Sequence, residues 1–233
     1  MQLSSGQPCF SGALLLLLST LWLWKNVTSA PECHSKDASC EVSLQELFDS
    51  AISQSKKIRD LSTTMWYIFL TRSYNSQRFQ ERTTKAMNDC HGSFLENPDT
   101  EKEVKEIQSD VLLNVTLRMV GAWNTALQHL TKEMGGVLSI PPALSIFSLA
   151  KEIQEKNQEL LDDIYRIQRK VYPGFQEDKN YPVWSELASL QSTEENSRFL
   201  AAYNLVECLY FDMYDIKDNL NLLRCLIIPN NNC

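Results

Sequence analysis

Ala202-Tyr203-Asn204-Leu205-Val206-Glu207-Cys208 begins the last apolar pattern of the chain, which continues through Cys225 to the final residue, Cys233. Its apolar residues recur in alternating steps of four and three, at Ala202, Val206, Leu209, Met213, Ile216, Leu220 and Leu223. On a helix with about 3.6 residues per turn, these positions form one stripe. We therefore predict a long helix here, against which the other elements pack and to which cysteines attach them.

The first 30 residues have the pattern of a secretory signal peptide. Their apolar run, residues 13–24, is too short to span a membrane. Thr28-Ser29-Ala30 offers a cleavage site after Ala30, with cleavage after Ser29 as the alternative. We predict that residues 1–30 are removed and that residues 31–233 form one exported domain. No later run of 18 apolar residues occurs, so we expect no membrane insertion.

The cysteine number and the net charge limit the classes of protein to which the mature chain can belong. Removal of residues 1–30 takes away Cys9 and leaves six of the seven cysteines. An even number after a signal peptide indicates three disulfides, for which 15 pairings are open. The same segment contains one base, Lys25, and no acid, so the formal net charge of −7 becomes −8. An acidic chain with scattered bases is a poor binder of nucleic acid or anionic membranes.

Three further helices are predicted upstream. The first begins at Ser43, where Ser43-Leu44-Gln45-Glu46 fits a capping box, and runs to about residue 74. The second follows a similar box at Thr100-Glu101-Lys102-Glu103 and ends near Gly135-Gly136. The third lies between Pro141-Pro142 and Tyr172-Pro173-Gly174. The expected stripe of the second helix is Val104, Ile107, Val111, Val115, Met119, Ala122, Ala126 and Leu130.

The connections between these helices are long, short and long. A helix of about 28 residues rises roughly 42 Å, and a connection of about 25 residues spans up to about 85 Å. Each long connection is therefore able to return the chain to the end where the preceding helix began. We predict an all-α, long-chain, up-up-down-down four-helix bundle with two crossover loops and three disulfides.

The motifs resemble those of the prolactin/growth-hormone family over the whole mature chain. One signature is Cys90-His91-Gly92-Ser93 with Pro98 and Gly121-Ala122-Trp123, and the other is Cys208-Leu209 with Asp212, Leu220, Leu223 and Cys225. Tyr181-Pro182-Val183-Trp184-Ser185, the start at Val42-Ser43-Leu44 and the end at Asn230-Asn231-Asn232-Cys233 also resemble prolactins. The chain is most similar to the placental and decidual prolactin-like proteins. The resemblance implies the disulfides Cys33–Cys40, Cys90–Cys208 and Cys225–Cys233.

The resemblance also implies binding to a cell-surface receptor of the cytokine class. One site would use helices one and four, and the other a cleft beside helix three. The histidines that prolactins present on helix one fall at Lys56 and Arg59, and the histidine and lysine of helix four fall at Tyr214 and Asp215. The glycine of the second-site cleft falls at Asp163. We therefore expect weak or absent binding to the prolactin receptor itself.

Aromatic residues are the candidates that replace the usual receptor surface. Phe211 and Tyr214 lie across the fourth helix from its stripe, and Tyr67 points outward on the first helix. Asp218 adds a further acid to the same outward face. The alternative is that the first crossover covers these aromatic residues.

The remaining motifs give weaker indications. Asn114-Val115-Thr116 predicts glycosylation at Asn114. Arg166, Arg169 and Lys170 would serve a weak glycosaminoglycan site, although bases at a helix end are ordinarily solvated dipole partners. Asp162-Asp163 is interpreted as a solvated edge. His34, His91 and His129 lack metal-ligand spacing, and no cofactor is predicted.

Motifs of common enzyme classes, such as a nucleophile elbow or a Walker loop, do not occur. Together with the signal peptide, the resemblance therefore implies a secreted, monomeric, non-catalytic hormone. The alternative is an extracellular module that binds a glycosaminoglycan or another non-receptor ligand.

Overall fold

The structure is a computed structural model that describes residues 42–73, 90, 106–137, 143–174 and 180–228. These ranges contain four long helices, α2 (Leu44–Ser73), α5 (Ser109–Val137), α6 (Ala143–Val171) and α8 (Glu195–Ile227), and a short helix α7 (Leu187–Leu190). All of them belong to the compact unit Val42–Cys233. The described ranges contain no strand.

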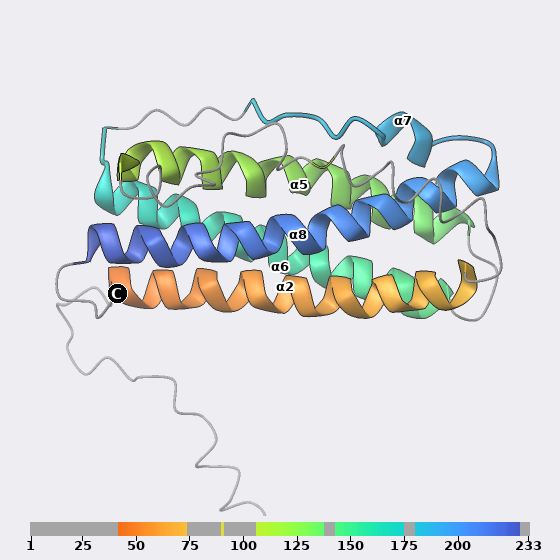
Figure 1. Cartoon of the computed structure of the whole chain (residues 1–233), viewed down its shortest axis with the longest axis horizontal. Helices are drawn as coiled ribbons and strands as arrows, with labels where there is room; N and C mark the ends of the chain where they lie inside the picture. Colours follow the sequence, from red (N-terminus) through yellow and green to blue (C-terminus); the bar gives the residue numbers. More distant parts are fainter. Residues whose placement is uncertain (1–41, 74–89, 91–105, 138–142, 175–179, 229–233) are drawn as a thin grey trace, which may run out of the picture. The chain divides into compact units, whose positions relative to one another are not determined.

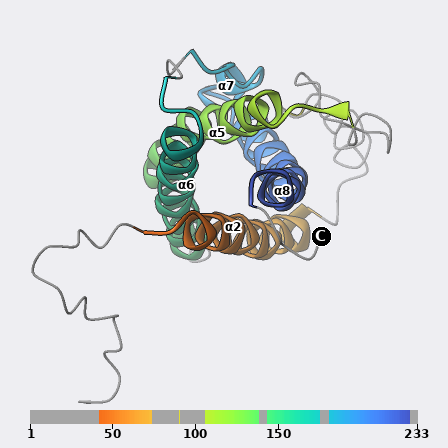
Figure 2. The same cartoon turned by 90° about the vertical axis from the view of Figure 1, so that its left-hand side faces the viewer.

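The four long helices form an up-up-down-down bundle. Helices α2 and α5 run in one direction and α6 and α8 in the other (Figure 1). Both α6 and α8 pack against α2 and against α5. The end-on view in Figure 2 shows the resulting square, in which neighbouring helices are antiparallel. The predicted fold class and the order of long, short and long connections are therefore confirmed.

A reciprocal capping box begins α2, as the sequence predicts. The backbone N–H of Ser43 donates to Oε2 of Glu46 (2.8 Å), and the backbone N–H of Glu46 donates to Oγ of Ser43 (3.1 Å). The two bonds satisfy N–H groups that have no partner within the helix. They also hold the pKa of Glu46 below its usual value, because they favour its charged form.

Helix α5 differs from its predicted form. Glu106 is helical but Ile107 and Gln108 are not, so the long helix begins at Ser109, and it continues past Gly135-Gly136 to Val137. The predicted helix start at the Thr100 box lies outside the described residues. Most of the expected stripe is buried, at Met119, Ala122, Ala126 and Leu130, but Val111 is 49% exposed. The buried face is wider than this stripe, because it also contains Leu112, Leu113, Leu117, Val120, Trp123 and Leu127. A helix that packs against elements on several sides buries a wider face than a single stripe.

Helices α6 and α8 follow their predicted patterns closely. Tyr172-Pro173-Gly174 follows the end of α6 at Val171, where the Tyr172 N–H donates to the Gln168 carbonyl (2.7 Å). On α8, all seven predicted stripe positions from Ala202 to Leu223 are buried in the core. The periodic pattern of the last helix therefore predicted its inner face correctly.

Two buried polar side chains form hydrogen bonds between helices. Nε1 of Trp123 on α5 donates to Oδ2 of Asp212 on α8 (2.9 Å), and both side chains are buried. Nδ2 of Asn157 on α6 donates to the carbonyl of Val120 on α5 (3.2 Å). These bonds fix α5 against its two neighbours, because breaking one would leave a buried polar group without a partner.

A disulfide joins Cys90 to Cys208 on α8, with a Cα–Cα distance of 5.1 Å and a sequence separation of 118 residues. Cys225 is also disulfide-bonded. Cys33, Cys40 and Cys233 lie outside the described residues. The middle disulfide is thus confirmed, whereas the pairs Cys33–Cys40 and Cys225–Cys233 stay predictions.

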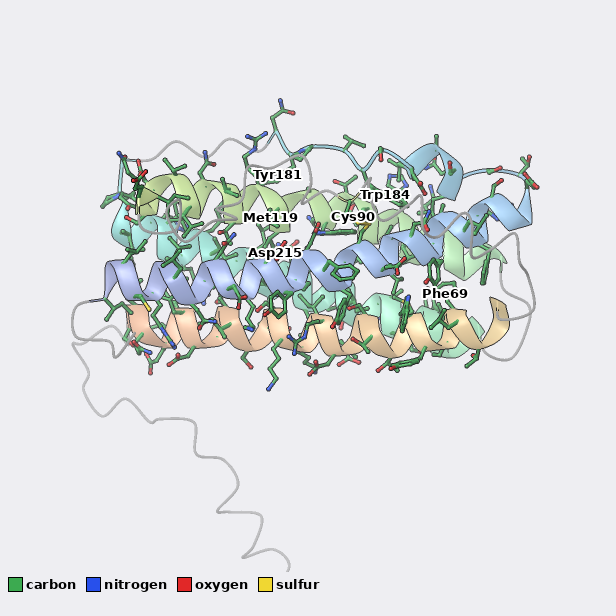
Figure 3. The ribbon with its side chains drawn as sticks, in the orientation of Figure 1. Phe69, Cys90, Met119, Tyr181, Trp184 and Asp215 are labelled. Carbon is green, nitrogen blue, oxygen red and sulfur yellow. A yellow bond between two sulfur atoms is a disulfide. The ribbon has the colours of Figure 1, made fainter. Side chains whose placement is uncertain are left out.

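The second long connection covers the outer side of α5. Figure 3 shows Tyr181 and Trp184 on this connection, which also contains α7. The Tyr181 ring lies directly over Gly121 of α5, at a place where any Cβ would overlap the ring. The hydroxyl of Tyr181 is hydrogen-bonded to that of Tyr165 on α6. Because glycine has no Cβ, the second connection can pack closely against α5 at position 121.

Candidate functional site: the α2/α8 face

The surface along the contact between α2 and α8 carries most of the predicted receptor residues, and we call it the α2/α8 face. The two helices are antiparallel and in extensive contact (Figure 1). At one end of the face, Nη1 of Arg224 on α8 lies 3.0 Å from Oδ1 of Asp49 on α2. At the other end, Nε1 of Trp66 on α2 donates to the hydroxyl of Tyr203 on α8 (2.9 Å). These cross-helix contacts fix the register of the face.

Three predicted residues come from α2. Lys56 is exposed, and Arg59 is half-buried with its Nη2 3.5 Å from Oδ1 of Asp60. Tyr67 is 58% exposed. Asp49 contacts α8, and Lys56, Arg59 and Thr63 follow it at helical spacing. They therefore lie on the side of α2 next to α8.

Four predicted residues come from α8. Phe211 and Tyr214 are 44% and 48% exposed. Asp215 is half-buried, and Asp218 is exposed with its Oδ1 3.0 Å from Nζ of Lys217. The same Lys217 ammonium lies 4.8 Å from the centre of the Tyr214 ring. The α8 part of the face thus combines exposed aromatic rings with an ion pair within the helix, Lys217 with Asp218.

A groove of about 210 Å³ opens in this face between α2 and α8. We call it the aromatic groove, and its lining residues are Thr63, Trp66, Tyr67, Glu207, Tyr210 and Phe211. The rings of Trp66 and Tyr67 meet edge to face with centroids 5.2 Å apart, as do those of Tyr210 and Phe211. Tyr67 and Phe211 are the only two of the predicted receptor residues that line the described groove.

One carboxylate, that of Glu207, lines the aromatic groove. It accepts a hydrogen bond from the Tyr203 hydroxyl, which in turn accepts from Trp66. Burial raises the pKa of Glu207, and the hydrogen bond from Tyr203 partly opposes that rise. Burial and the nearby Glu207 carboxylate raise the pKa of Tyr203. The groove therefore contains a partly desolvated acid.

The predicted second-site residue, Asp163, lies between α6 and α2 rather than at a solvated edge. Asp163 is only 8% exposed, so the interpretation of Asp162-Asp163 as a solvated edge is correct for Asp162 alone. Oγ of Ser50 on α2 donates to Oδ2 of Asp163 (2.6 Å), and Nη1 of Arg166 lies 3.8 Å from Oδ1. Asp163 is buried because α2 packs over this side of α6.

Comparison with known families agrees with the bundle and its long connections. A sequence model of the Somatotropin hormone family matches residues 16–233. The chain belongs to the Somatotropin hormone family. This is a family of secreted, non-enzymatic polypeptide hormones that act on cytokine receptors. No helix within the described ranges is long and apolar enough to cross a membrane.

Sequence reasoning about this somatotropin-family chain missed four residues of the aromatic groove: Thr63, Trp66, Glu207 and Tyr210. The sequence does indicate the α8 side of the groove, because Tyr203, Glu207 and Tyr210 follow one another at helical spacing along the edge of the α8 stripe. The pairing of that edge with Trp66 depends on the contact between two helices that are distant in sequence. That contact could not be derived from either helix alone.

The other predicted sites of this somatotropin-family chain are solvent-accessible. Asn114 is half-buried on α5, while Thr116 of the same sequon is buried and donates to the Leu112 carbonyl (2.8 Å). Arg166, Arg169 and Lys170 are exposed towards the end of α6. Glycosylation at Asn114 and glycosaminoglycan binding by the three bases stay predictions.

Proposed function

We propose that the mature chain is a secreted hormone of the prolactin type that binds a cytokine-class receptor through its α2/α8 face, without acting as an agonist of the prolactin receptor. The observation that carries the proposal is the exposure of Tyr67, Phe211 and Tyr214 on this one face. Exposed aromatic residues that border a groove are the usual anchors of protein interfaces. Motif resemblance supports assignment to the placental and decidual prolactin-like proteins.

The charged residues of the α2/α8 face support binding to a receptor other than the prolactin receptor. The face presents Lys56, Arg59 and Asp215 where the resemblance expects two histidines and a lysine. A reversed charge opposite an unchanged receptor costs several kcal/mol. Fixed positive charges in place of histidines also remove groups that titrate near neutral pH. A receptor with a different charge pattern fits this face better than the prolactin receptor does.

We further propose that the hormone engages one receptor at a time. The buried carboxylate of Asp163 occupies the position of the glycine expected in the second-site cleft. Opening that contact for a second receptor would break the hydrogen bond from Ser50 and leave a buried acid without that donor.

Two binding measurements test the proposal. Residues 31–233 are expected to show no binding to the prolactin receptor ectodomain at nanomolar concentrations and no receptor activation. The same protein should bind saturably to cells that carry its receptor, and Tyr214→Ala should weaken that binding at least about tenfold, as for an interface anchor. Val183→Ala is the matched control, because Val183 is an exposed apolar residue of the second connection.

Two results would contradict the proposal. The first is nanomolar binding with activation of the prolactin receptor. The second is salt-sensitive retention on heparin that is lost when Arg166, Arg169 and Lys170 are replaced, together with cell binding that depends on the same three bases. The second result would favour the glycosaminoglycan-binding module.

A further inference from the structure

The aromatic groove on the α2/α8 face has the dimensions of a site for a single side chain. Its volume is about 210 Å³, below the roughly 300–1,000 Å³ of pockets that hold drug-sized ligands. Its rims are the exposed rings of Tyr67 and Phe211. Trp66 and Tyr210 complete an aromatic lining. Such a lining suits a side chain that has both apolar and polar parts.

The acid in the groove is incompletely paired. The Glu207 carboxylate accepts from Tyr203, but its Oε2 atom is buried and has no hydrogen-bond partner among the described residues. None of the six lining residues of the described groove is basic. A desolvated carboxylate oxygen without a donor is costly, and a cationic donor that enters the groove would remove that cost.

The bases nearest along the two helices have partners elsewhere. Nη2 of Arg59 lies 3.5 Å from Asp60, and Nζ of Lys217 lies 3.0 Å from Asp218. The positive charge that complements Glu207 is therefore not supplied by either of these neighbours. A binding partner that brings a cation into the groove would supply it.

We propose that the aromatic groove receives an arginine side chain of the receptor, whose guanidinium group donates to the Glu207 carboxylate between aromatic rings. This inference rests on the proposed function, because it names the chemistry of the partner at the same face. Arginine fits better than lysine, since its planar and weakly hydrated guanidinium stacks on aromatic rings while it donates to a carboxylate.

A small cationic probe tests the groove without the receptor. Arginine amide is titrated into ¹⁵N-labelled residues 31–233 at constant ionic strength. Citrulline amide is the control, because it has the same α-amino group and a neutral side chain of the same shape. The indole N–H signal of Trp66 reports on the groove, while those of the buried Trp123 and Trp184 report on the fold. We expect a saturable shift of the Trp66 signal with arginine amide and none with citrulline amide.

Two variants with the same change of charge complete this experiment. Glu207→Gln should weaken the response to arginine amide about tenfold, the loss expected for one charge-assisted hydrogen bond. Glu155→Gln should leave it unchanged, because Glu155 is exposed on α6 and pairs only loosely with Lys151 (3.8 Å). The proposal is overturned by equal responses to both amides, by no response to arginine amide, or by a response that Glu207→Gln leaves intact.

Receptor-binding measurements distinguish a failure of the arginine site from a failure of the proposed function. If Tyr214→Ala weakens saturable cell binding while Glu207→Gln does not, the arginine site is wrong and the proposed function stands. If the groove binds arginine amide as expected but the protein shows no saturable cell binding, the proposed function is wrong. The arginine site would then serve a different protein partner.

Discussion

The hydroxyl of Ser50 on α2 donates a 2.6 Å hydrogen bond to Oδ2 of Asp163 on α6. Two further polar contacts cross between the same helices. Nε2 of Gln54 donates to Oε2 of Glu159 (2.6 Å), and Nζ of Lys57 lies 2.9 Å from Oε1 of Glu152. Contacts within the bundle therefore occupy the α2–α6 surface at three successive turns, which supports the proposal of a single receptor-binding face.

The first prediction concerns Asp163. Asp163→Ala should lower the free energy of unfolding by about 1–3 kcal/mol, because it removes the acceptor of a partly buried hydroxyl. Urea denaturation of residues 31–233 measures the change. The double variant Ser50→Ala/Asp163→Ala should be less destabilised than the sum of the two single changes. Strict additivity would show that the two side chains are not coupled.

Gly121 and Tyr181 give the second prediction. Alanine normally favours a helix over glycine by about 1 kcal/mol, but a Cβ at position 121 would overlap the Tyr181 ring. Gly121→Ala should therefore be destabilising, since overpacking costs about 1–3 kcal/mol. In a Tyr181→Ala background the same change should become stabilising. Thermal denaturation of the four proteins tests this reversal, and a destabilising Gly121→Ala in both backgrounds would contradict it.

The sequence predicted the bundle because its strongest signals are local or periodic. The α8 stripe from Ala202 to Leu223 and the Ser43–Glu46 capping box each depend on spacing within one helix, and the structure contains both. Helix α5 was predicted less well, because it is covered by the second connection as well as by α6 and α8. Burial on several sides removes the contrast between faces that a periodic pattern needs.

The candidate site was only partly predictable for a related reason. Tyr67, Phe211 and Tyr214 are conspicuous as aromatic residues outside the apolar stripes, and all three are exposed. The role of Glu207 depends on its position across from Trp66, which only the packing of α2 on α8 defines. Likewise, Asp163 looked solvated beside Asp162, because its burial depends on contact with α2.

The third prediction concerns the disulfide between Cys90 and Cys208. Replacement of both cysteines by alanine should lower the free energy of unfolding by on the order of 4–5 kcal/mol. The reason is that the bond restricts the unfolded chain by closing a loop with a sequence separation of 118 residues. Replacement of Cys225 and Cys233, the predicted pair at the end of the chain, should cost about 2–3 kcal/mol in the same chain-entropy account. Denaturant titrations of both variants measure the two losses. A larger loss for the terminal pair would contradict the prediction.

The fourth prediction links stability and binding at Glu207. Burial raises the pKa of this acid above its ordinary value of 4.5, so the fold favours the protonated form. Glu207 therefore contributes fully to the stability of the fold below about pH 4.5. This contribution is lost as the pH rises through the higher pKa of the folded state. Glu207→Gln should therefore be more stable than the unchanged protein at pH 7, with a difference that shrinks as the pH falls towards 4.5.

Melting temperatures of the two proteins between pH 4 and 8 test this dependence, with Glu155→Gln as the control for loss of one negative charge. A substitution that stabilises the fold while it weakens binding is typical of a functional site, where an incompletely paired group is kept for a ligand. If Glu207→Gln destabilises the protein at pH 7, the carboxylate serves the fold. If it stabilises the protein and also reduces the response to arginine amide, the carboxylate is held in the groove for a partner.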